Sequence, residues 1–284
     1  MVKRKLFLPC LMCMLSICAG ATQAAGSVPL TAKQVVDRNV AARGGLTAWR
    51  AIKSMSMVGS LDAGKVDTRS VQERVGDQPG SRASRRVRPE AAKPGADTLK
   101  TVQLPFVMEL QRPRKMRLEI QFKGETAVQA YDGAAGWKLR PFLERREVES
   151  YTPDELKVAA QQQELDGPLV DYAAKGSKIA LEGMEPVEGR KAYKLKVTLK
   201  DGQVRRVWVD AETFLDIKID GTRQLGGKSR TVATYMRDYK SVNGVKVPYL
   251  LETKVEGVNG SEKIQIEQVA LNPKIADSRF TKPL

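Results

Sequence analysis

The sequence predicts a mainly β protein, a curled antiparallel half-barrel of about nine to eleven strands with an N-terminal helix and an inserted helical lid. Two observations carry this prediction. Apolar and polar residues alternate with a period of two in several segments, and dipeptides typical of tight turns separate these segments. Strands joined by short hairpins form an antiparallel sheet, and a sheet of that size must curl.

The first 25 residues have the features of a secretory signal peptide. Basic residues 3–5 precede an apolar stretch over residues 6–19, which is too short to span a bilayer, and small residues follow it. We therefore expect residues 1–25 to be removed and residues 26–284 to form a single domain in the periplasm. A lipoprotein signal ending at Cys18 is the alternative, but Ile17 is large where a small residue is expected. All three cysteines lie in this leader.

The chain is strongly basic, with a formal net charge of +15, of which +12 remains after the leader is removed. Outside the cytoplasm such a charge favours anionic lipid headgroups, lipopolysaccharide or acidic proteins as partners, rather than nucleic acid. A generally basic proteome is the alternative explanation.

The mature chain is predicted to open with a helix. Thr31 and Gln34 form a capping box, an apolar stripe of Val35, Val36 and Val40 follows, and Gly44-Gly45 marks the end of the helix. Trp49 and Ile52 then lead into the first strand.

Residues 75–99 are predicted to form a mobile basic loop, because they contain turn formers and almost no large apolar residue. Four arginines in this segment are candidates for contact with an anionic surface: Arg82, Arg85, Arg86 and Arg88. A solvated loop without such a role is the alternative.

From Leu104 onward the period of two is clear. Three segments carry it best, with apolar residues at Met116, Leu118, Ile120 and Phe122, at Tyr193, Leu195, Val197 and Leu199, and at Leu215, Ile217 and Ile219. Asp216, Lys218 and Asp220 are assigned to the solvent face. The turns are predicted at Asp132-Gly133, Asp201-Gly202, Gly226-Gly227, Asn243-Gly244 and Asn259-Gly260.

A helical lid is predicted over residues 153–174. Thr152-Pro153-Asp154-Glu155 is typical of a helix start, and this helix should run to about Leu165. A second short helix is expected over Pro168–Ala174, ended by Gly176. Helices inserted between two halves of a one-sided sheet would cover its apolar face.

The mature chain has no histidine and no cysteine, which excludes a Ser-His-Asp triad, a cysteine nucleophile and a histidine-based zinc site. Asp210 with Glu212 and Asp154 with Glu155 are the close acidic pairs, but a turn and a helix cap explain them. Residues 226–229 resemble a phosphate-binding loop but have the wrong spacing and flanks. We expect no enzyme activity, metal or cofactor.

Several segments, taken in order, resemble the periplasmic LolA/LolB-like family of outer-membrane lipoprotein-sorting proteins. They are Ala42-Arg43-Gly44-Gly45-Leu46, Tyr131-Asp132-Gly133 with Gly136-Trp137, Asp166-Gly167-Pro168-Leu169-Val170-Asp171-Tyr172, Asp238-Tyr239 through Asn243-Gly244-Val245-Lys246-Val247-Pro248, and Asn272-Pro273 with Phe280 and Pro283. This resemblance spans most of the mature chain.

The resemblance implies a half-barrel around an apolar cavity that holds acyl chains of a lipoprotein or lipid on the way to the outer membrane, with transport proteins of the two membranes as partners. In such carriers an arginine inside the barrel helps to govern cargo release, and the sequence does not assign it to a position here. The candidate cavity residues are Met116, Leu118, Ile120, Phe122, Leu169, Val170, Tyr172, Tyr193, Leu195, Val197, Leu215 and Ile217.

Core packing is the alternative role for each of these residues. Two further function classes stay open behind the carrier: a sensory or regulatory module of the same fold that binds a protein partner, and a secreted hydrolase that uses paired carboxylates.

Overall fold

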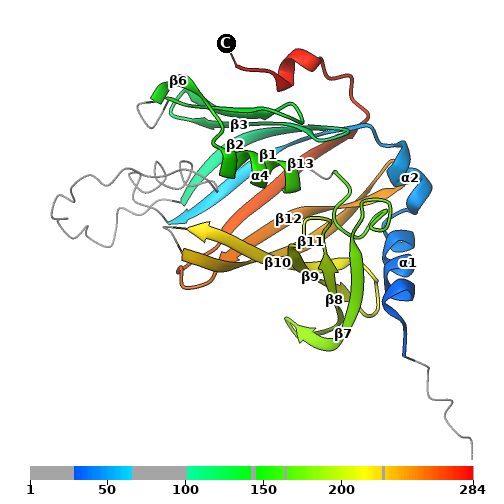
Figure 1. The fold of residues 1–284 in the computed structure, drawn as a ribbon. Coiled ribbons are helices and arrows are strands. Elements are labelled where there is room, and N and C mark those ends of the chain that lie inside the picture. The colour runs from blue at the N-terminus through cyan, green and yellow to red at the C-terminus, as the bar shows by residue number, and fades with distance from the viewer. Residues whose placement is uncertain (1–28, 66–100, 142–144, 163–164, 226–227, 284) are drawn as a thin grey trace, which may run out of the picture. The chain divides into compact units, whose positions relative to one another are not determined.

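The structure is a computed structural model that describes residues 29–65, 101–141, 145–162, 165–225 and 228–283. In this part of the chain, thirteen strands form one antiparallel sheet that curls without closing, because β6 and β7 remain as its two edges (Figure 1). The predicted fold class is confirmed, with more strands than the predicted nine to eleven. The strand order is β6-β5-β4-β3-β2-β1-β13-β12-β11-β10-β9-β8-β7.

The strands of the first half of the sheet are β1 (Ser54–Lys65), β2 (Thr101–Gln111), β3 (Lys115–Phe122), β4 (Glu125–Tyr131), β5 (Gly136–Arg140) and β6 (Arg145–Ser150). Those of the second half are β7 (Lys178–Val187), β8 (Arg190–Thr198), β9 (Val204–Asp210), β10 (Asp216–Leu225), β11 (Lys228–Val242), β12 (Val245–Val255) and β13 (Glu262–Leu271). The helices are α1 (Ala32–Ala42), α2 (Leu46–Ala51), α4 (Pro153–Gln162) and the 3-10 helix η2 (Asp277–Phe280).

Helix α1 begins at the predicted capping box. The Gln34 amide donates to Thr31 Oγ1 at 3.2 Å, and the Gln34 side-chain oxygen accepts from the Thr31 amide at 2.9 Å. Val35 and Val36 are buried as the apolar stripe predicts. Helix α2 was not predicted: after the break at Gly44 and Gly45 the chain turns helical again, and Trp49 lies inside this short helix.

The predicted lid is only partly helical. Helix α4 has the expected capping box, in which the Glu155 amide donates to Thr152 Oγ1 and the Glu155 carboxylate accepts from the Thr152 amide. The second helix, predicted over Pro168–Ala174, is wrong: residues 165–176 form successive turns. Positive φ angles at Gly167 (78°), Asp171 (53°) and Gly176 (76°) are incompatible with a right-handed helix and explain the difference.

The hairpin between β11 and β12 forms at Asn243 (φ 46°) and Gly244 (φ 86°), as predicted from this dipeptide. In β10 the predicted alternation fails at one residue. Asp216 was assigned to the solvent face but is 3% exposed, because the register with β9 shifts between Asp216 and Lys218. This bulge turns a carboxylate into the interior.

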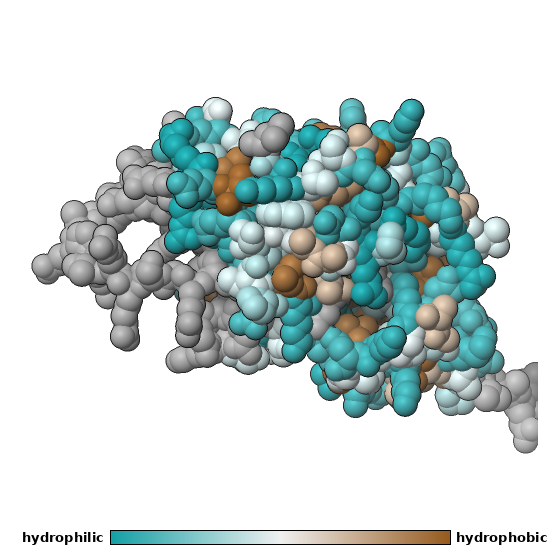
Figure 2. Space-filling view, turned by 45° about the horizontal axis from the view of Figure 1, so that its top comes forward, coloured by the Kyte–Doolittle hydropathy of each residue, from teal (hydrophilic) through white to brown (hydrophobic). Residues whose placement is uncertain are grey.

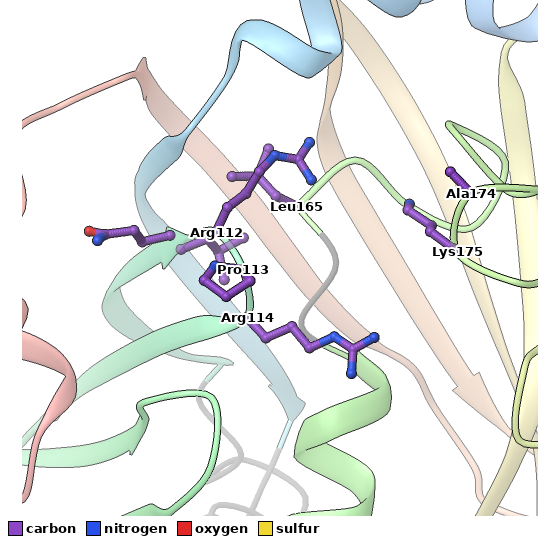
Figure 3. Close-up of a pocket in the computed structure, with 8 residues that line it drawn as sticks. Arg112, Pro113, Arg114, Leu165, Ala174 and Lys175 are labelled. Carbon is purple, nitrogen blue, oxygen red and sulfur yellow. The ribbon is translucent and has the colours of Figure 1, made fainter.

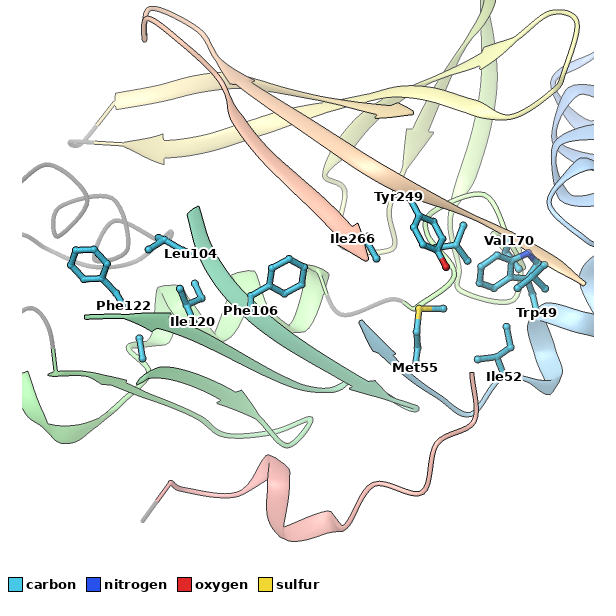
Figure 4. Packing of buried hydrophobic residues seen from close by; sticks show 13 residues of the cluster. Trp49, Ile52, Met55, Leu104, Phe106, Ile120, Phe122, Val170, Tyr249 and Ile266 are labelled. Carbon is cyan, nitrogen blue, oxygen red and sulfur yellow. The ribbon is translucent and has the colours of Figure 1, made fainter. Parts of the chain in front are cut away.

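The main apolar cluster lies between strands β1 to β4 and strands β12 and β13, and Figure 4 shows Phe106, Ile120, Tyr249 and Val170 pointing into it. Its buried members are Trp49, Ile52, Met55, Leu104, Phe106, Ile120, Phe122, Ala127, Val170, Val245, Val247, Tyr249 and Ile266. The face drawn in Figure 2 is mostly hydrophilic, with hydrophobic residues in small separate patches.

None of the helices in the described ranges is long and apolar enough to cross a membrane. The predicted leader, the basic loop over residues 75–99 and the Gly226-Gly227 turn lie outside the described residues.

Candidate functional site

One face of the sheet carries mostly apolar residues from β3 to β8, and we call it the covered face. Residues paired directly across antiparallel strands share a face, so the register can be followed through the sheet. In this way Ile120 of β3 shares a face with Leu195 of β8. The path runs through Ile120, Phe106, Gly59 and Ile266, continues two residues along β13 to Ile264, and passes through Leu251, Met236, Thr234, Ile219, Val207 and Leu195.

The predicted cavity residues of β3 lie together on the covered face. Ile120 and Phe122 belong to the main apolar cluster, Leu118 packs against it, and Met116 is buried between Leu110 and Tyr131 in the register. The sequence pattern therefore identified one coherent group of side chains.

The predicted residues of β8 form a second group on the covered face, near α1. Leu195 and Val197 are fully buried, and Tyr193 stacks on Phe214 with ring centroids 6.0 Å apart. The Arg38 guanidinium of α1 lies over the other aromatic ring of this pair, at 5.2 Å from the Phe214 centroid.

Ile217 lies elsewhere. It packs with Val187, Ala192 and Trp208 in a separate cluster, and Trp208 faces away from its β9 neighbours Val207 and Val209. Leu215 is half-buried and precedes β10. The structure thus does not bring Ile217 together with the β3 residues.

Three segments lie over the covered face: α1, residues 165–176 and α4. We call residues 165–176 the cover segment. Its Leu169 and Val170 are fully buried, Tyr172 is half-buried, and Leu165 packs against the main cluster. The apolar side chains of this segment are therefore part of the packing over the covered face.

Helix α4 is fixed to the sheet by a buried ion pair. Glu155 and Lys138 contact each other with their side chains 8% and 7% exposed. Lys138 pairs with Gln129 of β4, and Gln129 pairs with Leu118, so Lys138 shares the covered face. The acidic pair Asp154 and Glu155 is thus explained by the helix start and by this ion pair.

A polar network crosses the interior at the end of α1. Arg43 Nη1 lies 3.3 Å from Asp216 Oδ2, and Asn39 Nδ2 donates to Asp216 Oδ1 at 2.9 Å. Arg43 Nη1 also donates to the backbone oxygen of Asp166 at 3.0 Å. Burial raises the pKa of Asp216, and the Arg43 charge and the Asn39 hydrogen bond oppose this effect. The pKa of Tyr239, whose hydroxyl donates to the backbone oxygen of Asp216, is also raised, mainly by burial.

Arg112 also holds the cover segment through Asp166, and Lys175 binds the same carboxylate from within the segment. Arg112 Nη2 donates to Asp166 Oδ2 at 2.7 Å, and Lys175 Nζ donates to Asp166 Oδ1 at 2.6 Å. At the surface, Arg50 binds the Asp171 carboxylate through two hydrogen bonds of 2.7 and 2.6 Å. Arg50 lowers the pKa of Asp171 through these hydrogen bonds, against a smaller effect of burial. The cover segment is therefore held by charged contacts from three separate parts of the chain.

Sequence reasoning missed this network, although two of its members stand inside the segments that carry the family resemblance. Arg43 and Asp166 belong to Ala42-Arg43-Gly44-Gly45-Leu46 and to the segment that begins at Asp166. The backbone oxygen of Arg43 also accepts from Trp49 Nε1 at 3.1 Å and from the Lys246 amide at 3.0 Å. The place of Arg43 and Asp166 in these two segments was the signal that the sequence offered, and the structure shows that the segments meet.

A hollow of about 570 Å³ opens between the turn from β2 to β3 and the cover segment. Its lining residues are Leu110, Gln111, Arg112, Pro113, Arg114, Leu165, Ala174 and Lys175. Figure 3 shows the Arg114 and Lys175 side chains extending into the space between these two segments. None of the cavity residues predicted from the sequence is in this lining.

The acidic side chains of the described ranges were compared with the arrangements that metal ligands and paired catalytic carboxylates adopt. There, no three His, Cys, Asp or Glu side chains are grouped as metal ligands would be. Asp210 accepts hydrogen bonds from Thr213 and pairs with Arg190 at 2.8 Å, so it stabilises the turn that also contains Glu212. The arginines at 82, 85, 86 and 88 lie outside the described residues.

No family model and no curated protein matches the sequence. The structure is similar to a LolA superfamily protein from Nitrosomonas europaea (12% identity, 89% of this chain and 99% of that chain covered, TM-score 0.53). It is also similar to a DUF1329 family protein from Desulfovibrio piger (12%, 88% and 97%, 0.53) and to an outer membrane lipoprotein-sorting protein domain from Vibrio parahaemolyticus (9%, 87% and 94%, 0.51). At these identities the likeness concerns the fold alone, and the fold of this chain is LolA-like.

Proposed function

We propose that this protein binds acyl chains of a lipid or lipoprotein against the covered face of its sheet and carries them through the periplasm towards the outer membrane. The observation that carries this proposal is the construction of the cover. The cover segment supplies buried apolar side chains at Leu165, Leu169 and Val170, but charged contacts hold its position. Apolar ligands can replace such side chains if the charged contacts open.

On energetic grounds, we expect an acyl chain to take the place of side chains of the cover segment rather than to enter an empty space. Eight of the twelve predicted lining residues are buried, and Val170 of the cover segment belongs to the main apolar cluster, so we expect an acyl chain to displace part of the cover before it is buried. Each methylene transferred from water contributes about 0.8 kcal/mol, so a chain of ordinary length offsets the loss of a few buried side chains. The pair of Arg50 with Asp171 is largely exposed, and exposed ion pairs contribute little to stability, so this contact of the cover can open readily.

Arg43 is our candidate for the interior arginine that the family resemblance implies. Its guanidinium is buried between Asp216 of the sheet and the backbone of the cover segment, and it lies over the Trp49 ring at 4.6 Å. Movement of the cover segment would break the bond to Asp166 while the pair with Asp216 stays. Arg43 thus connects the movement of the cover segment during ligand uptake to the sheet.

The proposed location in the periplasm rests on the leader sequence, and the proposed contact with an anionic membrane rests on the arginines at 82, 85, 86 and 88. Charges of this kind contribute about 1 kcal/mol each near an anionic surface. Neutralising all four should reduce association with anionic vesicles at low salt and leave the melting temperature nearly unchanged. Equal vesicle binding by the wild type and this variant would remove the contact from the proposal.

Native mass spectrometry of the protein purified from its own periplasm tests the carrier function directly. We expect bound lipid or lipoprotein, which is lost after delipidation and regained when acyl chains are supplied. Tyr172→Asp, at the half-buried residue of the cover segment, provides the test variant: it should fold but retain less lipid. A stable protein partner without lipid would instead favour the sensory or regulatory module.

A further inference from the structure

The hollow beside the cover segment combines an apolar floor with a cationic rim. Leu110 and Leu165 line it and also pack against the main apolar cluster, so its floor is continuous with the covered face. Arg112, Arg114 and Lys175 line the same hollow. Its volume of about 570 Å³ is within the range of small-ligand sites. Apolar and cationic side chains therefore line the same hollow (Figure 3).

The rim has an excess of positive charge. Arg112 and Lys175 both bind the carboxylate of Asp166, which is buried with its side chain 3% exposed. Arg114 is exposed and has no ion pair among the described residues. The nearby Asp171 is engaged by Arg50 through two hydrogen bonds. Among the described residues that line this hollow or bind its cations, three cations face the one carboxylate of Asp166, which leaves a net charge of about two for a ligand to neutralise.

Arg114 differs from its two neighbours in what it can offer. The Arg112 guanidinium is committed to Asp166 and to the backbone oxygens of Ile52 and Trp49, and the Lys175 ammonium to Asp166 and the backbone oxygen of Gly167. Arg114 retains its planar group of donors, which fits a phosphate or carboxylate through two parallel hydrogen bonds. It is therefore the residue of this rim able to bind an anion without breaking the network beneath it.

We infer that this hollow binds the anionic headgroup of an amphiphile, with Arg114 contacting a phosphate or carboxylate and the first part of the acyl chain lying along Leu110 and Leu165. This inference rests on the proposed carrier function and assigns its ligand a charge. The site is at the junction of the cover segment and the sheet, so a headgroup held here places the attached chain at the edge of the covered face.

Isothermal titration calorimetry with three probes tests the assignment: dodecyl phosphate, the neutral detergent dodecyl maltoside, and inorganic phosphate, each detergent below its critical micelle concentration. We expect dodecyl phosphate to bind most tightly. Arg114→Gln should weaken it about fivefold at low ionic strength, less at high salt, and leave dodecyl maltoside binding unchanged. The matched control, Lys191→Gln, removes the same charge from an exposed residue of β8 that does not line the hollow and should change neither.

The outcomes separate the two proposals. Equal binding of both detergents to the wild type, or equal binding of dodecyl phosphate to the wild type and Arg114→Gln, overturns the headgroup assignment and leaves the carrier function standing. Inorganic phosphate that binds as tightly as dodecyl phosphate would mean a site for the free anion and would also overturn it. Failure of both detergents to bind overturns the carrier function and the headgroup assignment together.

Discussion

Arg43 and Asp216 form an ion pair across the interior, with 3.3 Å between Nη1 and Oδ2 and with side chains only 8% and 4% exposed. The pair joins the residue that ends α1 to the bulge in β10. Its carboxylate also accepts from Asn39, and its guanidinium also holds the backbone of Asp166. A charge in this position is tolerated only while its partner is present.

Replacing one member of the pair should therefore cost more than replacing both. We expect Arg43→Met to lower the free energy of unfolding by about 3–5 kcal/mol, because it leaves the Asp216 carboxylate buried without its cation. The double variant with Asp216→Leu should lose clearly less than the sum of the two single losses. Urea unfolding at pH 7 measures all three. As a control, Lys33→Met breaks an exposed pair with Asp37 and should cause no measurable loss of unfolding free energy. If the losses of the two single variants add up to the loss of the double variant, Arg43 and Asp216 are not coupled.

The charged contacts of the cover segment should govern how fast ligand enters. Arg50→Ala removes the two hydrogen bonds to Asp171, so we expect faster uptake of a fluorescent fatty acid with little change in melting temperature. Arg190→Ala is the matched control, because Arg190 is similarly exposed and pairs with Asp210 in a turn. Stopped-flow fluorescence gives the rates. Identical uptake by the wild type and Arg50→Ala would show that Arg50 does not restrain the cover.

The parts of the fold that follow from local patterns were predicted well. The capping boxes at Thr31 and Thr152 and the Asn243-Gly244 hairpin depend on neighbouring residues, and the structure confirms all three. The turns over residues 165–176 depend on positive φ angles that a helix-like apolar pattern does not reveal. Local sequence therefore placed the elements but not the conformation of the cover segment.

The interior network was beyond the reach of pattern reasoning for a physical reason. Asp216 follows the alternation of a solvent-facing residue, and only the bulge in the pairing with β9 turns it inward. Arg43 precedes the glycines that mark the predicted helix end, but its burial depends on Trp49 and on a contact 123 residues away, at Asp166. Such long-range partners are set by the register of the whole sheet and not by spacing along the chain.

Gly44 should not tolerate a side chain. It has a φ of 111°, and a Cβ atom there would collide with the backbone oxygen of Gly244 and lie 2.8 Å from Val245 Cα. We expect Gly44→Ala to destabilise the protein by at least about 2 kcal/mol, from strain and overpacking combined. Gly202→Ala is the control for the backbone term, since Gly202 has a φ of 86° and nothing within 4 Å of its Cβ position. Thermal unfolding should show a clearly smaller loss for Gly202→Ala, and equal losses would exclude the close packing of the two turns as the cause.

The C-terminal helix η2 should make stability depend on pH. Arg279 binds Glu109 and Glu119 on the face opposite the covered one, at 2.9 Å in each case. Burial raises the pKa of Glu119, but hydrogen bonds and charges from Arg117 and Arg279 outweigh it, and the net shift is downward. A carboxylate with a lowered pKa in the folded state contributes stability that is present above its unfolded pKa of about 4.3 and is lost as the pH falls through the folded value.

Glu119→Gln should therefore be less stable than the wild type at pH 7, and this difference should shrink steadily as the pH falls below about 4. Urea unfolding of both proteins from pH 7 to pH 3 provides the comparison. A difference that stays constant over this range would mean that Glu119 acts through its shape and not through its charge.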